Sequence, residues 1–73
     1  MATISVTSDI TGNVWKILVK PGDQIEEDAE LLILESMKME IPVTAPEDAV
    51  IKEICVTEGQ AISEGDVVAV LEV

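Results

Sequence analysis

The chain contains two copies of one pattern, and this internal repeat constrains the fold more than any other feature. At an offset of 37 positions, residues 14–36 align with residues 51–73. Similar residues then coincide in order, among them Gly22 with Gly59, Ile25 with Ile62 and Leu34 with Leu71. Two similar copies should adopt one structure, so each half of the chain predicts the structure of the other.

Short stretches rich in Val and Ile are separated by turn signals. In residues 15–19, Trp, Ile and Val alternate with Lys and Leu, and the period of two is typical of half-buried strands. Turn sequences such as Pro21-Gly22-Asp23 and Glu64-Gly65-Asp66 bound these stretches. The pattern predicts many short strands.

Residues 23–41 contain no Gly or Pro, and their Glu, Leu and Met content favours a helix. The repeat overrules this preference. Residues 31–34 correspond to Val68-Ala69-Val70-Leu71, a β-branched stretch that follows a turn. We therefore predict an all-β fold, a flattened barrel or sandwich of two four-stranded antiparallel sheets with pseudo-twofold symmetry. Seventy-three residues are too few for two domains, so we expect residues 1–73 to form one domain.

Composition excludes several classes of function. The chain has no His and one Cys, so it cannot build a Cys/His zinc site or a Ser–His–Asp triad. Its net charge of −11 would repel nucleic acids and anionic membranes, so we expect neither as a partner. The sequence shows neither a signal peptide nor an apolar run of spanning length. We expect a cytoplasmic protein that is monomeric in isolation.

The junction between the two halves carries the most distinctive residues. Ser36-Met37-Lys38 links the two predicted strands there, which places Lys38 at the exposed tip of a tight hairpin. Met37 and Met39 flank it, and methionine is a flexible side chain suited to contact with several partners. A lysine between strands is most often a solubilising turn residue, and a methionine most often fills a core. A Met-Lys-Met triplet midway between two repeats favours a functional reading instead.

The segment Glu35-Ser36-Met37-Lys38-Met39-Glu40 resembles the attachment motif of biotinyl domains, usually Ala-Met-Lys-Met after an acidic residue. The resemblance covers the whole chain. It extends to Gly12-Asn13-Val14-Trp15-Lys16, to Val19-Lys20-Pro21-Gly22-Asp23, to Ala45-Pro46 and to Val56-Thr57-Glu58-Gly59. At this length the chain is similar to a free-standing biotin/lipoyl attachment protein, or to the minimal carrier domain of an acyl-CoA carboxylase.

The resemblance implies a biotin carboxyl carrier, which is a substrate of enzymes rather than an enzyme. A biotin protein ligase would join biotin to Lys38 as an amide. The tethered biotin would serve a biotin carboxylase and a carboxyltransferase of a biotin-dependent carboxylase, such as acetyl-CoA carboxylase. Met37 and Met39 would determine modification specificity. Glu35, Ser36 and Glu40 would supply the context of the motif.

Three other functions are weighed against this one. The first is a lipoyl carrier of an oxo-acid dehydrogenase or glycine-cleavage system, although lipoyl domains typically carry Asp-Lys-Ala around the lysine. The second is an unmodified β adaptor module, in which Lys38 is an ordinary turn residue. The third, a carboxylate-based hydrolase, has the least support because nothing in the sequence suggests a pocket.

Four further positions carry structural expectations. Asp28 occupies a turn position where the second copy has Gly65, and we expect it to tolerate a positive φ. Trp15 is expected to pack against the core. Cys55 is expected to be a small buried hydrophobic residue rather than a reactive thiol. Glu26-Glu27-Asp28 is expected to be a solvated face rather than a metal site.

Overall fold

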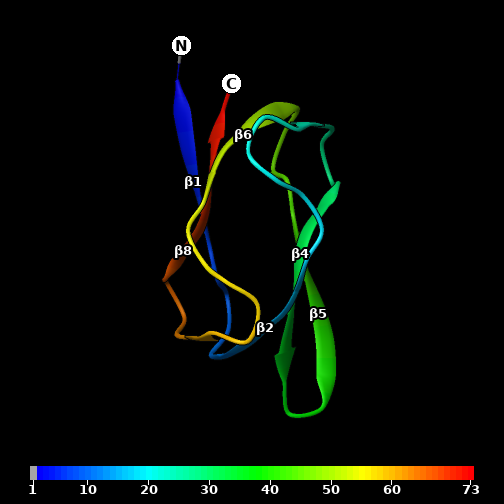
Figure 1. Cartoon of the computed structure of the whole chain (residues 1–73), viewed down its shortest axis with the longest axis vertical. Helices are drawn as coiled ribbons and strands as arrows, with labels where there is room; N and C mark the ends of the chain where they lie inside the picture. The colour runs from blue at the N-terminus through cyan, green and yellow to red at the C-terminus, as the bar shows by residue number, and fades with distance from the viewer. Residues whose placement is uncertain (1) are drawn as a thin grey trace.

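Residues 2–73 are described by a computed structural model in which eight strands form two four-stranded antiparallel sheets (Figure 1). One sheet has the order β1-β8-β6-β3 and the other β5-β4-β2-β7. The predicted all-β fold is confirmed, and the sheets pack as an open sandwich rather than a closed barrel. The strands are β1 Thr3–Thr7, β2 Gly12–Ile17, β3 Gln24–Ile25, β4 Glu30–Ser36, β5 Met39–Thr44, β6 Ala49–Ile54, β7 Ala61–Ile62 and β8 Val67–Glu72.

The two halves repeat each other strand for strand. The bounds of β2 and β6 differ by 37 positions, as do those of β3 and β7. Local irregularities repeat as well: β2 bulges between Val14 and Lys16, and β6 bulges between Ile51 and Glu53. We call residues 37 positions apart counterparts. The expected pseudo-twofold symmetry is therefore present in the strand order, the register and the bulges.

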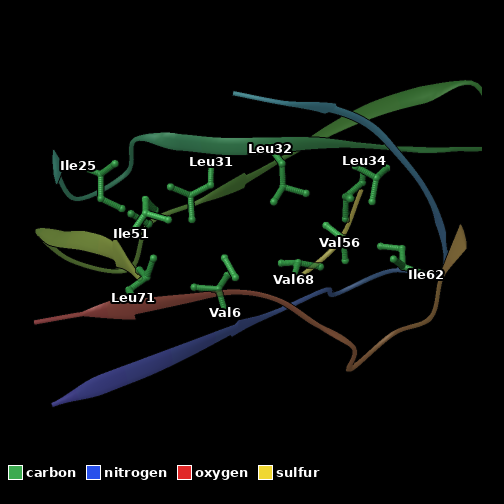
Figure 2. Close-up of a cluster of buried hydrophobic side chains, with 13 residues drawn as sticks. Val6, Ile25, Leu31, Leu32, Leu34, Ile51, Val56, Ile62, Val68 and Leu71 are labelled. Carbon is green, nitrogen blue, oxygen red and sulfur yellow. The ribbon is translucent and has the colours of Figure 1, made fainter. Parts of the chain in front are cut away.

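The core lies between the two sheets, and Figure 2 shows side chains from both sheets directed toward one another. Burial of each large aliphatic side chain contributes about 1.5–3 kcal/mol, so this layer is the main source of stability. Among residues 2–73, every buried polar side-chain atom has a hydrogen-bond partner within the protein. The core residues are Val6, Val14, Ile25, Leu31, Leu32, Leu34, Ala45, Ile51, Val56, Ile62, Val68, Ala69 and Leu71.

The stretch with helical composition forms strands, as the repeat predicted. β4 is paired on both sides, with β2 and with β5, so its residues contribute to two ladders and to the core at once. Leu31 and Leu32 are both fully buried because the register of β4 against β5 shifts between Glu30 and Leu32. Pairing and burial outweigh the weak helical preference of the composition.

Left-handed backbone conformations close the turns before β4 and β8. Asp28 has φ 69° and its counterpart Gly65 has φ 92°, so the expectation for Asp28 is confirmed. Each directs its N–H onto the other half of the chain: Asp28 donates to the Ala45 carbonyl and Gly65 to the Ser8 carbonyl, both at 2.8 Å. These paired bonds tie each turn to a neighbouring segment.

Two expectations about side-chain burial are wrong. Trp15 is 46% exposed, because it lies at the bulge of β2, where the extra residue is displaced from the alternation that places Val14 in the core. Cys55 is exposed as well, just beyond the end of β6. Its counterpart Leu18 is also exposed, so in both halves this position faces solvent.

The molecule is elongated, 36 × 17 × 17 Å, and its two ends are related by the pseudo-symmetry. The N- and C-termini lie together at one end, and the β4–β5 hairpin lies at the other (Figure 1). The Val73 N–H donates to the Ala2 carbonyl at 2.9 Å, and these residues are the counterparts of Ser36 and Met39 in the hairpin. None of residues 2–73 forms a helix long and apolar enough to cross a membrane.

Candidate functional site

Met37 and Lys38 form the two-residue turn that joins β4 to β5. Ser36 and Met39 are the last paired residues before it. Met37 has φ 51° and Lys38 has φ 66°, so both central residues are left-handed, as in a type I′ hairpin turn. The predicted placement of Lys38 at a hairpin tip is confirmed.

This turn uses residues that its geometry disfavours. Asn-Gly is the sequence usually preferred where both central residues need positive φ. A residue with a Cβ loses about 1–2 kcal/mol in the left-handed region, so Met37 and Lys38 together store local strain. Such conformations persist where the surrounding structure enforces them, and they gather at functional sites. The conformation therefore marks this turn as the candidate functional site.

The side chains at the tip are open to solvent. Met37 is 91% exposed and Met39 63% exposed, and Lys38 is exposed between them. Neither methionine contributes to the core. The three residues that the sequence singled out therefore form one exposed group, in which apolar flexible side chains surround a primary amine.

The base of the hairpin is held by the segment between β1 and β2. The Ser36 hydroxyl donates a hydrogen bond to the Thr11 carbonyl at 3.0 Å. Gly12 lies against the backbone of β4, and a Cβ at this position would overlap the carbonyl oxygen of Glu35. Sequence reasoning missed Thr11 and Gly12 as supports of the site. A signal for Gly12 was present in the repeat, where its counterpart is Ala49. Since the second half folds with alanine at this position, the glycine of the first half meets a requirement of its own.

Carboxylates border the lysine on both strands. Glu35 and Glu40 are directly opposite each other across β4 and β5, and both are exposed. Like charges at opposed positions are mildly destabilising, and they add to the net charge of −11. A partner that approaches the tip therefore meets a negative surface, which favours a partner with basic residues around its own site.

The hollows of the surface are separate from the lysine. A groove of about 530 Å³ lies at the end that carries Val73, lined in part by Glu26, Asp48 and Glu72. A slot of about 160 Å³ lies between β1 and β5, lined by residues such as Val6, Ile10, Leu34 and Ile41. Within residues 2–73 no group of three or more acidic or Cys side chains could hold a metal ion. The site thus offers a single amine on a rigid support.

Comparison with known proteins decides the family. The family model described as "Biotin-requiring enzyme" matches residues 2–71. The chain is 50% identical over 64 residues to the biotin/lipoyl attachment protein of Bacillus subtilis, with 88% of each chain covered.

The chain belongs to the biotin/lipoyl attachment family.

Two further likenesses extend this result. A biotinylated protein TB7.3 homolog of Mycobacterium leprae is 41% identical over 66 residues, which cover 90% of this chain and 93% of that one. The urea carboxylase of Kluyveromyces lactis contains a similar fold, with a TM-score of 0.91 and 31% identity over 97% of this chain, but only 6% of the carboxylase.

The relatives differ greatly in length. This chain matches most of the length of the short attachment proteins, but only 4% to 11% of relatives such as urea amidolyase and the acetyltransferase component of pyruvate dehydrogenase. As a biotin/lipoyl attachment domain, the chain is a carrier and not a catalyst, and carboxylases are among the proteins that carry this domain.

Proposed function

We propose that Lys38 is the attachment lysine and that the chain is a biotin carboxyl carrier. The observation that supports this most directly is the strained, exposed Met37-Lys38 turn, which presents one amine beyond the sheets. A turn of this kind has no value to the core, and an Asn-Gly turn would close the hairpin at lower cost. A function that needs a lysine at the tip accounts for the choice.

The surroundings of Lys38 suit a covalently held group rather than one bound in a pocket. Lys38 lines neither hollow, and no orphaned polar atom in the interior marks a binding site. Biotin, when attached, supplies a ring nitrogen that accepts and releases a carboxyl group. The chain's own residues would position that group: Ser36 and Gly12 fix the hairpin, and the Lys38 side chain gives the arm its freedom.

We infer that the attaching enzyme supplies the base for the reaction. Amide formation needs a neutral amine, whereas a lysine amine in water has a pKa of about 10.4 and is protonated at neutral pH. The described residues offer no His beside the turn to remove the proton. A biotin protein ligase would therefore deprotonate the amine, which then attacks the activated biotin carboxyl group and releases the activating nucleotide.

Tethering explains how so small a domain could serve large enzymes. A group on a flexible arm reaches two active sites in turn at high effective concentration, provided that the arm can span them. We propose that these sites are those of a biotin carboxylase and a carboxyltransferase, as the likeness to carboxylase domains suggests. On this proposal residues 1–73 act as one domain, monomeric in isolation and cytoplasmic, where those enzymes would meet it.

A lipoyl carrier is the second candidate, since relatives include components with a dihydrolipoyllysine residue. Met37 and Met39 favour biotin, because lipoyl domains typically carry Asp-Lys-Ala around the lysine, whereas this chain has Met-Lys-Met. Both candidates place the group on Lys38, so one experiment separates them.

Intact-mass measurement tests the proposal. The wild type and Lys38→Arg are incubated with ATP, biotin and a biotin protein ligase, with Lys52→Arg as the matched control on β6. One biotinyl increment on the wild type and on Lys52→Arg, and none on Lys38→Arg, is the expected result. An increment that survives Lys38→Arg would overturn the assignment of the lysine. No increment with biotin, but one with lipoate and a lipoyl ligase, would establish the second candidate, and failure of both would leave an unmodified adaptor.

A further inference from the structure

The repeat provides an internal control for the surface of the molecule. Both halves have the same backbone, but only the β4–β5 end carries the lysine turn, because its counterpart is the pair of chain termini. Surface side chains that differ between counterparts are not needed for the fold. Where they gather beside the turn, they point to a function that belongs to that end.

The outer face of the sheet β5-β4-β2-β7 carries larger apolar side chains than the equivalent face of the other sheet. Ile33 lies between the buried Leu32 and Leu34, so it faces outward, and its register partners are Pro42 and Lys16. On β2, Trp15 is 46% exposed at the bulge and Leu18 is 44% exposed just beyond the strand. We call Trp15, Leu18, Ile33 and Pro42 the outer patch, and the exposed Lys16 lies among them, opposite Ile33.

The counterparts of the outer patch are smaller or more polar. Lys52 stands in place of Trp15 and Cys55 in place of Leu18, while Val70 and Ser5 replace Ile33 and Pro42. The register is the same, because Val70 pairs with Ser5 and Glu53 as Ile33 pairs with Pro42 and Lys16. The fold therefore accepts a polar surface at these positions, and the chain's one aromatic side chain, 46% exposed, stands where the other half has a lysine.

The outer patch is close to the lysine turn. Ile33 precedes Ser36 by three residues, a separation of about 10 Å along a strand. A specific interface typically covers about 800 Å² on each partner, or a patch roughly 30 Å across. A partner centred near Glu35, between Lys38 and Ile33, would therefore cover both the lysine turn and the outer patch.

The chemistry of the border indicates the kind of surface that fits. Glu35 and Glu40 lie in the row between the outer patch and the tip. Next to Leu18, the Glu58 carboxylate accepts a hydrogen bond from the Ile17 N–H at 3.0 Å. This bond fixes the carboxylate beside β2. An apolar patch with a Trp and a carboxylate border matches an apolar pocket surrounded by Lys and Arg.

We propose that the outer patch is the docking surface for the biotin protein ligase, with Trp15 as its anchor. The inference rests on the proposed function of Lys38. Before modification the amine is only a four-carbon stem away from the backbone, so the enzyme that acylates it must contact the body of the domain. After modification the arm is longer by the length of the cofactor, and later enzymes can reach the group without that contact. The ligase is therefore the enzyme that needs a recognition surface beside the turn.

Kinetics with counterpart exchanges test the docking surface. Trp15→Lys installs the residue that the second half carries, so the bulge accepts it. Its expected effect is a fall in the ligase kcat/KM of about 10-fold or more, through KM with kcat retained. The matched control Lys52→Ala, at the counterpart position on the other sheet, should leave kcat/KM unchanged. If the wild type is modified and Trp15→Lys has the same kcat/KM, the docking proposal alone is overturned. If the wild type takes up no biotin, the proposed function is overturned and the docking proposal with it.

A second measurement leaves Trp15 in place and does not depend on turnover. The chain has one Trp, so labelling with 5-fluorotryptophan gives one fluorine resonance. In the unreactive Lys38→Arg background, titration with unlabelled ligase, ATP and biotin should shift or broaden this resonance in a saturable manner. A resonance that stays unchanged while the same variant inhibits biotinylation of the wild type would overturn the role of Trp15.

Discussion

Gly12 lies against the carbonyl oxygen of Glu35, and any side chain at this position would force the backbone of β4 to shift. The contact joins the β1–β2 connection to the base of the lysine hairpin, beside the hydrogen bond from Ser36 to Thr11. The hairpin is therefore fixed from the side, in addition to the pairing of its own two strands. Its tip can project while its base stays rigid.

The first prediction follows from this contact. Gly12→Ala should destabilise the protein by about 1–3 kcal/mol, because the added methyl group must displace the backbone of β4. The free energy of unfolding from urea denaturation measures the effect. The counterpart exchange Ala49→Gly is the control, and it should cost less, about 0.5–1 kcal/mol. Equal losses for the two variants would show that β4 yields readily.

A second prediction concerns the strain in the turn. Met37→Asn should stabilise the protein by about 0.5–1 kcal/mol, because Asn tolerates the left-handed region better than Met does. Met37→Val, which places a β-branched residue at the same φ, should destabilise it. Thermal unfolding of the two variants beside the wild type gives both signs. If both changes left the melting temperature unaltered, the turn would not store strain.

The counterpart turns allow a third prediction. Gly65→Ala should lower the free energy of unfolding by about 1–2 kcal/mol, because the residue at this position has φ 92°. Asp28→Gly should change it little, since Asp is already among the residues that accept positive φ and Gly adds entropy to the unfolded chain. Chemical denaturation distinguishes the two. A neutral Gly65→Ala would contradict the need for glycine there.

A fourth prediction concerns the pH dependence of Cys55. Partial burial of the thiol and, to a lesser extent, the nearby Glu53 carboxylate raise the pKa of Cys55. The reactive thiolate is therefore scarcer at a given pH than in a free cysteine, and alkylation by iodoacetamide near pH 8 should be slower than for a cysteine peptide. Glu53→Gln should move the rate profile toward lower pH. An unchanged profile would leave burial as the sole cause.

Most of the fold was predicted from the internal repeat. It identified residues 31–34 as a strand against their own composition, because the second copy is less ambiguous, and it located the lysine turn at the junction of the halves. It also flagged Asp28, whose left-handed conformation the structure confirms. These features depend on the local chain and on comparison within it.

The errors arose where the alternation of a strand is interrupted, as at Trp15, or has just ended, as at Cys55. Strict alternation assigned Trp15 to the inward set, but the bulge of β2 turns it outward, and a bulge leaves no clear signal in one sequence. Gly12 was missed because its role is a contact with Glu35, 23 positions away. Contacts of this range become visible only when the strands are assembled.

The termini pair at the end of the sandwich that is opposite the lysine turn. A polypeptide that continued from either end would therefore leave the molecule at the position farthest from Lys38. The rigid body, 36 Å long, would then add its own length to whatever the lysine carries. In that arrangement the length of the sandwich would set how far a group attached to Lys38 could travel, while the lysine side chain would make only the final adjustment.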